Sequence, residues 1–204
     1  RSKEGLVDWE ERKGKRVMTW IDGYKKKISS LEEAVSVVQS KNKIYVSGNA
    51  ATPLTIIKAL AGRRDELRDV EVTHVLLLGD DPLSKPAMEG HFRHNSLFVG
   101  PADRKAIGEG RADYIPIFLY EIPGLFYSGI IDLDVAFLHL SPPDSFGYMS
   151  FGVECLASKA AAECAKIVVA EVNDKMPRTL GNSFIHISQV DKVVEISREL
   201  PELV

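Results

Sequence analysis

Polar side chains that could bind a small carboxylate follow an apolar stretch in the second half of the chain. Residues 135–140 are apolar at all but one position, and they stop at Ser141-Pro142-Pro143-Asp144, which neither a strand nor a helix can continue. The prolines fix the backbone, while Ser141 offers a hydroxyl group and Asp144 a carboxylate. A Pro-Pro-Asp segment is more often a plain turn than a binding site, so the segment alone predicts only a candidate site.

A second candidate is a run of small residues between a predicted strand at 43–47 and the helix predicted after it. Gly48 and Asn49 open this run, Thr52 suits the N-cap of the helix, and Pro53 suits its first position. Free amides at a helix start could hold a phosphate or a carboxylate, so we expect a larger side chain at Gly48 to disturb binding more than folding. The run is neither a Walker loop, because no Gly-Lys-Ser/Thr follows, nor a dinucleotide fingerprint, because Gly48 stands alone.

No residue in the sequence has the surroundings of a catalytic nucleophile. There is no Gly-x-Ser-x-Gly elbow. Cys155 and Cys164 lie on one predicted helix and point about 180° apart, so we interpret them as buried thiols that do not pair with each other. His139 lies inside an apolar strand, where a hydrogen-bonded core histidine is the expected role. Glu171 is the best-placed carboxylate, although a glutamate at a strand end commonly supports the fold.

Three residues form a partial zinc-binding pattern. Glu89 precedes His91 and His94, which have the His-x-x-His spacing. No further ligand follows at a known spacing, so we expect no metal.

Strands and helices alternate along most of the chain, which predicts an α/β fold with a mainly parallel sheet flanked by helices. The predicted strands are 43–47, 70–78, 97–99, 114–120, 133–140, 148–151, 166–172, 184–187 and 193–196, and the predicted helices are 30–40, 53–61, 103–110, 122–127 and 153–165. Ligands of parallel sheets bind beyond the carboxyl ends of the strands. We therefore expect loops 48–53, 141–147 and 173–178 to surround one crevice, with Gly79 in a possible fourth loop.

The composition limits the class of protein. The 204 residues include 26 Lys plus Arg against 29 Asp plus Glu, so no global field favours nucleic acid or an anionic membrane. No run approaches the roughly 20 apolar residues that span a bilayer, and the start of the chain has no secretory signal. We expect a soluble protein of a reducing compartment, with residues 1–28 as an arm and 29–204 as one α/β domain. The apolar end of the sequence suggests that more chain follows.

Five longer motifs follow one another along the chain. They are SGNAATP from Ser47, HVLLLGD from His74, SPPDSFGYMSFGVE from Ser141, AKIVVAEVND from Ala165 and GNSFIHISQVDKVVE from Gly181. In this order and spacing the sequence resembles the amino-terminal half of the acetyl-CoA hydrolase/transferase family, such as the 4-hydroxybutyrate and butyrate:acetate CoA-transferases. The resemblance covers about 30–203, nearly the whole chain.

The resemblance implies a CoA-transferase-like domain of the NagB/RpiA/CoA-transferase type. It implies an enzyme that moves coenzyme A, as a substrate, between an acyl-CoA and a small carboxylic acid of the acetate, butyrate or 4-hydroxybutyrate type. The glutamate that forms the thioester would lie in a carboxyl-terminal half beyond Val204, so no catalytic residue is expected in this chain, and the chain alone is expected to be inactive. The positions that would face the substrate are Gly48, Asn49, Thr52, Pro53, Gly79, Ser141, Pro142, Pro143, Asp144 and Asn173.

Several alternatives stay open at this point. The protein could instead be an acetyl-CoA hydrolase, or a non-catalytic domain that binds a carboxylate or an acyl-CoA. We expect the carboxyl-terminal domain and further copies of the chain as partners, and neither nucleic acid nor a membrane. A cytoplasmic location is expected, with the mitochondrial matrix as the alternative, because the long start departs from the short bacterial one.

Overall fold

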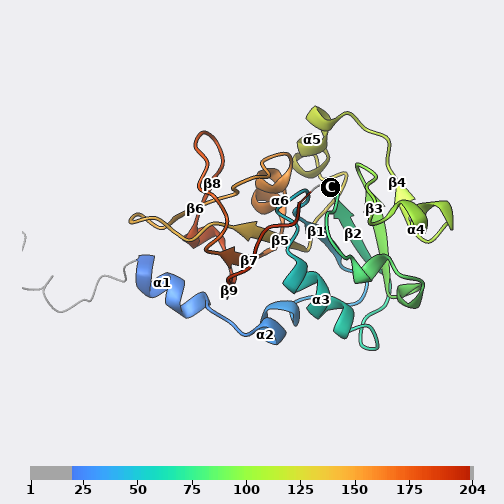
Figure 1. Ribbon diagram of the computed structural model, residues 1–204, viewed down its shortest axis with the longest axis horizontal. Coiled ribbons are helices and arrows are strands. Elements are labelled where there is room, and N and C mark those ends of the chain that lie inside the picture. Colours follow the sequence, from blue (N-terminus) through green and yellow to red (C-terminus); the bar gives the residue numbers. More distant parts are fainter. Residues whose placement is uncertain (1–19, 203–204) are drawn as a thin grey trace, which may run out of the picture.

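A seven-stranded parallel sheet forms the centre of the molecule (Figure 1). The structure is a computed structural model that describes residues 20–202. The strand order is β4-β3-β2-β1-β5-β7-β9, and every neighbouring pair is parallel. These strands are β1 (Lys43–Val46), β2 (Val70–His74), β3 (Phe92–Ser96), β4 (Asp113–Tyr114), β5 (Val135–Leu140), β7 (Ile167–Asn173) and β9 (Lys192–Ile196). The predicted α/β fold with a mainly parallel sheet is confirmed.

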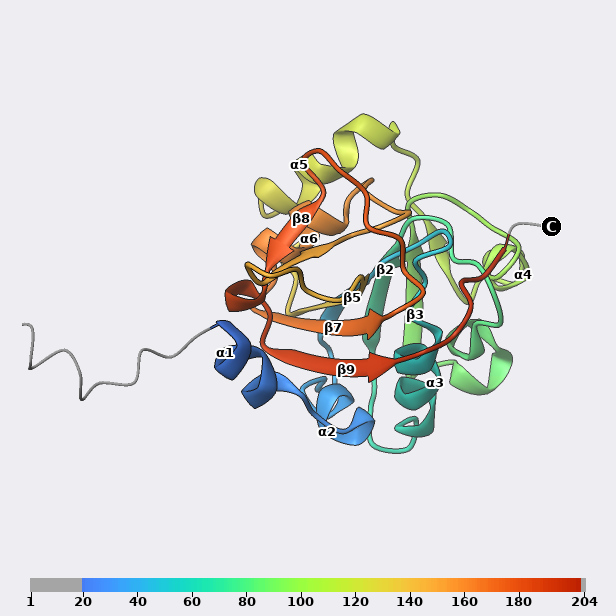
Figure 2. The same ribbon diagram turned by 60° about the vertical axis from the view of Figure 1, so that its left-hand side comes forward.

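Helices cover both faces of this sheet (Figure 2). The α-helices are α1 (Trp20–Lys27), α2 (Leu31–Val35), α3 (Leu54–Gly62), α4 (Arg104–Gly108), α5 (Ile122–Tyr127) and α6 (Ser158–Cys164), and the 3-10 turns are η2 (Pro82–Ser84), η3 (Pro86–Met88), η4 (Leu119–Glu121) and η5 (Ile187–Gln189). Helices α2 and α3 pack on one face, and α5 and α6 pack on the other. The fold therefore has three layers, and β5 lies in the middle one.

Strand β5 is continuously apolar because both of its faces are covered. All six of its residues are buried. Val135 and Phe137 belong to the core beneath α2 and α3, whereas Leu138 and Leu140 belong to the core beneath α5 and α6. Alternate side chains of one strand thus enter two different cores, as expected for a central parallel strand.

Several predicted boundaries were wrong. The capping box of Ser30 and Glu33 is present, but α2 ends at Val35, not near residue 40. Residues 92–96, where no strand was predicted, form β3, whereas the strand predicted at 97–99 is a loop that follows it. This strand escaped detection because its inward side chains are Phe92, His94 and Ser96, so burial alternates without an apolar run.

Three further predicted elements are shorter than expected. Strand β2 stops at His74 instead of 78, and β4 has only two residues, of which Tyr114 alone lies in the expected 114–120 strand. Helix α6 begins at Ser158 instead of 153, so Cys155 precedes it, and the two cysteines do not share a helix. Cys155 is exposed and Cys164 half-buried, which corrects their interpretation as buried thiols.

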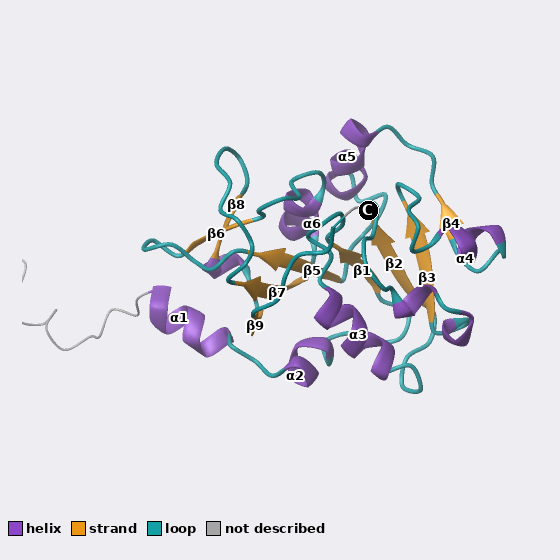
Figure 3. Cartoon of the chain, viewed as in Figure 1, coloured by secondary structure: helices purple, strands orange, loops and turns teal. Residues whose placement is uncertain are grey.

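A short antiparallel ribbon extends from one end of the sheet (Figure 3). It pairs β6 (Tyr148–Ser150) with β8 (Phe184–His186), so the partner of the strand predicted at 148–151 comes from far along the chain. Helix α1 lies close by, with the indole of Trp20 donating to the Ser145 carbonyl at 2.9 Å. The part of the expected arm before Trp20, including Trp9, lies outside the described residues.

Truncation of the central strand should be costly. Leu138→Ala removes a fully buried side chain, and we expect the free energy of unfolding to fall by about 2–5 kcal/mol, the usual range for such cavities. Leu180→Ala is the control, since Leu180 is 85% exposed and its truncation should change stability by less than about 0.5 kcal/mol. Urea titration followed by circular dichroism measures both values, and equal effects of the two variants would contradict the central position of β5.

Candidate functional site

The order of strands reverses between β1 and β5. The chain leaves β1 toward β2, β3 and β4, and then returns to the other side of β1 through β5, β7 and β9. The loops that follow β1 and β5 therefore diverge at the carboxyl edge of the sheet, which is where open parallel sheets bind ligands. Both loops contain residues predicted to contact the substrate.

The loop after β1 is held tightly against the loop after β2. A Cβ atom on Gly48 would lie 1.8 Å from the carbonyl oxygen of Val75, so only glycine permits this approach. The amide of Asn49 donates to the carbonyl of Leu76 at 2.6 Å. Asn49 and Leu76 have φ values of 53° and 50°, a conformation that costs energy for residues other than glycine and that is often found at functional sites.

Thr52 holds the loop in place through hydrogen bonds, but it is not the N-cap of α3. Its hydroxyl donates to the carbonyl of Asn49 at 2.7 Å and accepts from the amide of Leu78 at 3.1 Å. The N-cap of α3 is Pro53, so the predicted capping role of Thr52 was wrong. Asn49 is half-buried, and no hydrogen bond engages its side-chain amide in the described part of the chain. This amide can therefore contact a ligand.

A buried ion pair anchors the same loop from the α3 side. Glu171, which is fully buried, accepts from the Arg198 guanidinium at 2.8 Å and from the amide of Ile56 in the first turn of α3 at 3.0 Å. Arg198 also donates to the carbonyl of Thr52 at 2.8 Å. Burial raises the pKa of Glu171, while Arg198 opposes the shift. These contacts support a structural role for Glu171, and sequence analysis gave no sign of Arg198.

A second buried glutamate lies near the loop on the α6 side. Glu154 accepts hydrogen bonds from the amide of Leu156 at 2.7 Å and from the hydroxyl of Ser158, which also contacts the Tyr45 hydroxyl. Burial raises the pKa of Glu154, whereas the hydrogen bonds that it accepts, including one from the backbone of Gly48, oppose the shift. Sequence analysis missed Glu154. The only sign of it in the sequence is that it is an acidic residue just before an alanine-rich helix.

His139 is a core residue without its expected hydrogen bonds. It pairs with Glu171 across β5 and β7, and neither ring nitrogen has a hydrogen-bond partner among the described residues. Burial, followed by the charge of Arg198, lowers the pKa of His139 to about 3. The imidazole is therefore neutral, and the expectation of a hydrogen-bonded histidine was wrong.

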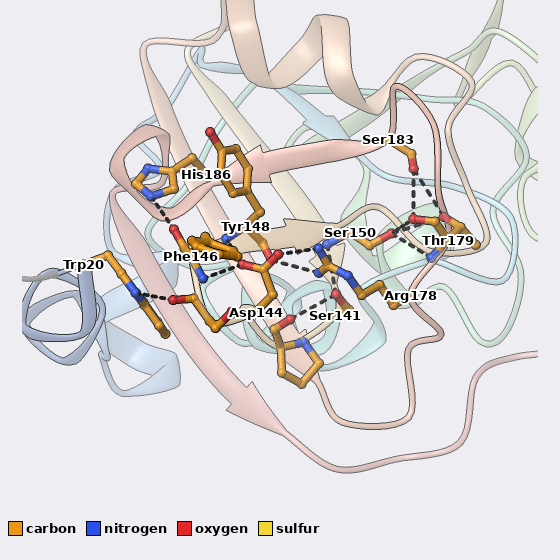
Figure 4. Close-up of polar contacts among 12 residues, drawn as sticks. Trp20, Ser141, Asp144, Phe146, Tyr148, Ser150, Arg178, Thr179, Ser183 and His186 are labelled. Carbon is orange, nitrogen blue, oxygen red and sulfur yellow. Dashed lines mark hydrogen bonds and ion pairs between the residues drawn. The ribbon is translucent and has the colours of Figure 1, made fainter.

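The loop after β5 is a turn organised by Asp144 (Figure 4). One carboxylate oxygen accepts from the amides of Phe146 and Tyr148, both at 2.9 Å, and the other accepts from Arg178 at 2.6 Å. The hydrogen bond from Tyr148, then those from Phe146 and Arg178, lower the pKa of Asp144. The hydroxyl of Ser141 accepts from the amide of Ser150 at 2.9 Å, so it fastens β6.

The remaining predicted residues occupy several places. Pro142 and Pro143 line a groove of about 600 Å³ together with Trp20 and Tyr24 of α1. The side chain of Asn173 is buried and holds both the N–H and the carbonyl of Arg198.

Gly79 lies beside Leu54 at the start of α3 and lines another pocket of about 420 Å³. The structure thus brings the loop after β1 together with Asn173 and Gly79. The Ser141 to Asp144 turn lies against β6, α1 and the loop after β7, which contributes Arg178 and Asp174.

The partial zinc pattern is divided in space. His91 contacts Arg68 and the carbonyl of Leu67, whereas His94 points into the interior from β3. Among residues 20–202 no group of three or more side chains has the arrangement of a metal site. No helix in this same range is long and apolar enough to cross a membrane.

Comparisons with known proteins agree on one family. The model of the acetyl-CoA hydrolase/transferase N-terminal domain matches residues 12–202. The 4-hydroxybutyrate coenzyme A transferase of Clostridium kluyveri is 44% identical over 91% of this chain and 43% of its own length. The butyryl-CoA:acetate CoA-transferase of Anaerostipes caccae is 35% identical over 87% of this chain and 41% of its own length.

A solved structure shows the same fold. The crystal structure of 4-hydroxybutyrate CoA-transferase from Porphyromonas gingivalis has a TM-score of 0.77 and 33% identity, and the match covers 91% of this chain and 43% of that one. The chain therefore spans less than half the length of the relatives that it matches.

Gly48 should tolerate no side chain. Gly48→Ala places a methyl group on the Val75 carbonyl, so we expect the free energy of unfolding to fall by about 1–3 kcal/mol, contrary to the expectation that binding would suffer first. Gly62→Ala is the matched control, because a Cβ there meets nothing within 4 Å and should be neutral or stabilising by up to about 1 kcal/mol. Thermal unfolding compares the two, and an unchanged melting temperature for Gly48→Ala would refute the close approach.

The Asp144 turn should depend on hydrogen bonding more than on charge. Asp144→Asn keeps an oxygen for the two amides and loses the exposed pair with Arg178, so we expect a loss below about 1 kcal/mol. Asp144→Ala loses both kinds of contact and should cost about 1–3 kcal/mol.

Lowering the pH should destabilise the Asp144 turn. Because the folded pKa of Asp144 is lowered, its stabilising effect is present above the ordinary value of about 4 and disappears as the pH falls below it. Unfolding curves between pH 3 and 7 measure this, and the dependence should be weaker in Asp144→Asn than in the parent. Equal pH dependence in the two proteins would count against the proposed charge effect.

Proposed function

The chain belongs to the acetyl-CoA hydrolase/transferase family, and from this membership we propose that it is the amino-terminal half of an enzyme that moves CoA between an acyl-CoA and a small carboxylic acid. The CoA-transferase names of its relatives support this activity, and the differing acyl groups in those names leave acetate, butyrate and 4-hydroxybutyrate as candidate acids.

The strained loop between β1 and α3 carries the proposal. It lies where the strand order reverses between β1 and β5, and half-buried Asn49 has a side-chain amide there that no described residue engages. An amide donor suits both the carboxylate of the acceptor acid and the oxyanion that develops when a thioester is attacked. Holding that donor in a fixed, strained backbone would reduce the reorganisation needed during the reaction.

The proposed reaction runs through two acyl exchanges. A glutamate supplied by the remainder of the protein attacks the acyl-CoA thioester and expels the CoA thiolate, giving a mixed anhydride. The thiolate then attacks the glutamyl carbonyl, which releases the acid and leaves a glutamyl-CoA thioester. A second acid reverses both steps.

The two buried glutamates of this chain are poor candidates for that nucleophile. Glu171 is held by Arg198 and by α3, and Glu154 is held by Leu156 and Ser158. An engaged, fully covered carboxylate cannot approach a thioester without breaking these contacts. We therefore propose that the nucleophile lies outside the 204 residues and that this half alone has no transfer activity.

The surface of the domain supports association with further protein. Large hydrophobic side chains are exposed near α5 and on the β6–β8 ribbon; they include Phe118, Tyr120, Tyr127, Ile130, Phe146 and Leu180. We propose that the carboxyl-terminal half and other copies of the protein cover such surfaces. The two free cysteines support a reducing compartment, so we propose the cytoplasm or the mitochondrial matrix.

The full-length protein tests the proposed activity directly. With acetyl-CoA and butyrate or 4-hydroxybutyrate, the new acyl-CoA should appear together with free acetate, and mass spectrometry of the acyl-enzyme should find the CoA adduct on a glutamate beyond Val204. Release of free CoA without a new acyl-CoA would indicate a hydrolase instead. Turnover by residues 1–204 alone would contradict the proposal that the nucleophile lies outside this half.

Asn49→Gly tests the loop. Glycine accepts the φ of 53° at no cost but removes the amide, so we expect kcat/KM to fall by about 10²-fold with an unchanged melting temperature. Asn182→Ala, on an exposed turn before β8, is the control and should retain full activity. Wild-type activity in Asn49→Gly would remove this side chain from the site.

A further inference from the structure

Four titratable side chains meet in the interior on the β3 side of the sheet, away from the loop after β1. They are His74 at the end of β2, His94 in β3, Asp81 in the loop after β2 and Asp103 before α4, and each is at most 4% exposed. His94 Nδ1 lies 2.9 Å from His74 Nε2, His94 Nε2 lies 3.3 Å from Asp81 Oδ2, and His74 Nε2 lies 3.6 Å from Asp103 Oδ2.

The short contact between the two imidazoles requires one donor and one acceptor. If His74 Nε2–H donates, neutral His94 accepts at Nδ1 and carries its own proton on Nε2, which then faces the carboxylate of Asp81. In the opposite direction two acceptors, His94 Nε2 and Asp81 Oδ2, would face each other. When both rings are neutral, the geometry therefore favours the tautomers protonated at Nε2.

An additional proton disturbs this arrangement wherever it binds. On His94 it would turn Nδ1 into a donor, so His74 would have to move its own proton from Nε2 to Nδ1, which has no partner among the described residues. On His74 it would place a charged N–H at that same Nδ1. Burial is the largest cause that lowers the pKa of His74, and a charge on His94 would lower it further. Burial raises the pKa of Asp81, so this carboxyl group ionises less readily than a solvated one and stabilises an added proton less.

The cluster joins two loops to the sheet. The second carboxylate oxygen of Asp81 accepts from the amide of Leu83 at 3.0 Å, and that of Asp103 accepts from the amide of Gly100 at 2.9 Å. Each aspartate thus holds its own loop with one oxygen and faces a histidine with the other. Both loops line the pocket of about 420 Å³ that contains Gly79.

Other charged groups near the cluster are engaged elsewhere. Lys85 pairs with Asp80, and Lys105 and Arg111 pair with Glu109, all around the outer part of the pocket. From α3, which packs on η2, Lys58 lines a groove shared with α2 instead. The charges that act on His74 and Asp81 are therefore those of the cluster itself.

We propose that this cluster is a proton-sensitive clamp, which holds the loops after β2 and β3 closed while the His74 ring is neutral and releases them when that ring takes up a proton. The sign follows from His74: its folded pKa lies below the ordinary value of about 6.5, so the stability that it contributes is complete above that pH and is lost as the pH falls below it. The loop after β2 also contacts Asn49 and Thr52, so its release would loosen the neighbouring loop as well.

Hydrogen exchange in the full-length protein tests the clamp. Between pH 7.5 and 5.5, after correction for intrinsic rates, protection of peptides covering 75–81 and 97–103 should fall about tenfold. This is the change expected when one proton binds the open form with a pKa of about 6.5, one unit above the lower pH, and does not bind the closed form. His74→Gln keeps a donor and an acceptor but does not titrate, so its loss of protection should stay below about twofold. His91→Gln, outside the cluster, should behave like the parent. Protection that does not change with pH in the parent would overturn the proposal.

Histidine NMR of the parent provides a readout that does not depend on any variant folding. With 15N-labelled histidine, His74 should remain neutral at pH 5.5 with the proton on Nε2. Titration of His74 near the ordinary pKa of about 6.5, or a proton on its Nδ1, would show that the clamp does not exist.

Discussion

The buried ion pair between Glu171 and Arg198 is the interaction on which the arrangement of the carboxyl edge depends. A covered carboxylate needs both an opposite charge and hydrogen-bond donors, and Glu171 receives the charge from Arg198 and a donor from the first turn of α3. The same guanidinium reaches the carbonyl of Thr52. One pair of charges thus fixes the end of β7, the start of α3, the loop after β1 and the segment after β9 relative to each other.

The loop after β1 is rigid because it is constrained from three directions. Arg198 holds it from the α3 side, Glu154 lies against it on the α6 side, and the backbone of the loop after β2 lies so close that only Gly48 fits. Positive φ angles at Asn49 and Leu76 are tolerated only where such surroundings over-determine the backbone. The Asp144 turn is constrained less by distant parts of the chain than the loop after β1. Its ion pair with Arg178 is partly exposed, and the hydrogen bonds of Asp144 to Phe146 and Tyr148 are local.

Sequence patterns among neighbouring residues correctly predicted the elements of this fold that depend on interactions between neighbouring residues. The apolar runs of β5 and β7, the capping box at Ser30 and the family motifs all follow from neighbouring residues. The sequence did not predict β3, because its buried positions include His94 and Ser96, whose partners come from other elements. Arg198 was missed for the same reason, since it lies in an extended segment and meets residues that are distant in sequence. The candidate loops were found, but their division between two places depends on tertiary packing that no local pattern contains.

The separation of 146 residues between Thr52 and Arg198 has a consequence for synthesis on the ribosome. The loop after β1 emerges early, yet the residue that fastens it and neutralises Glu171 is translated after β9. At roughly 5–20 residues per second, the nascent domain spends on the order of ten seconds with its edge unfastened. During that interval the amino-terminal strands can collapse together, but Glu171 cannot be buried without cost. Of the parts that meet at this carboxyl edge, the segment that contains Arg198 is therefore the last to become available during synthesis.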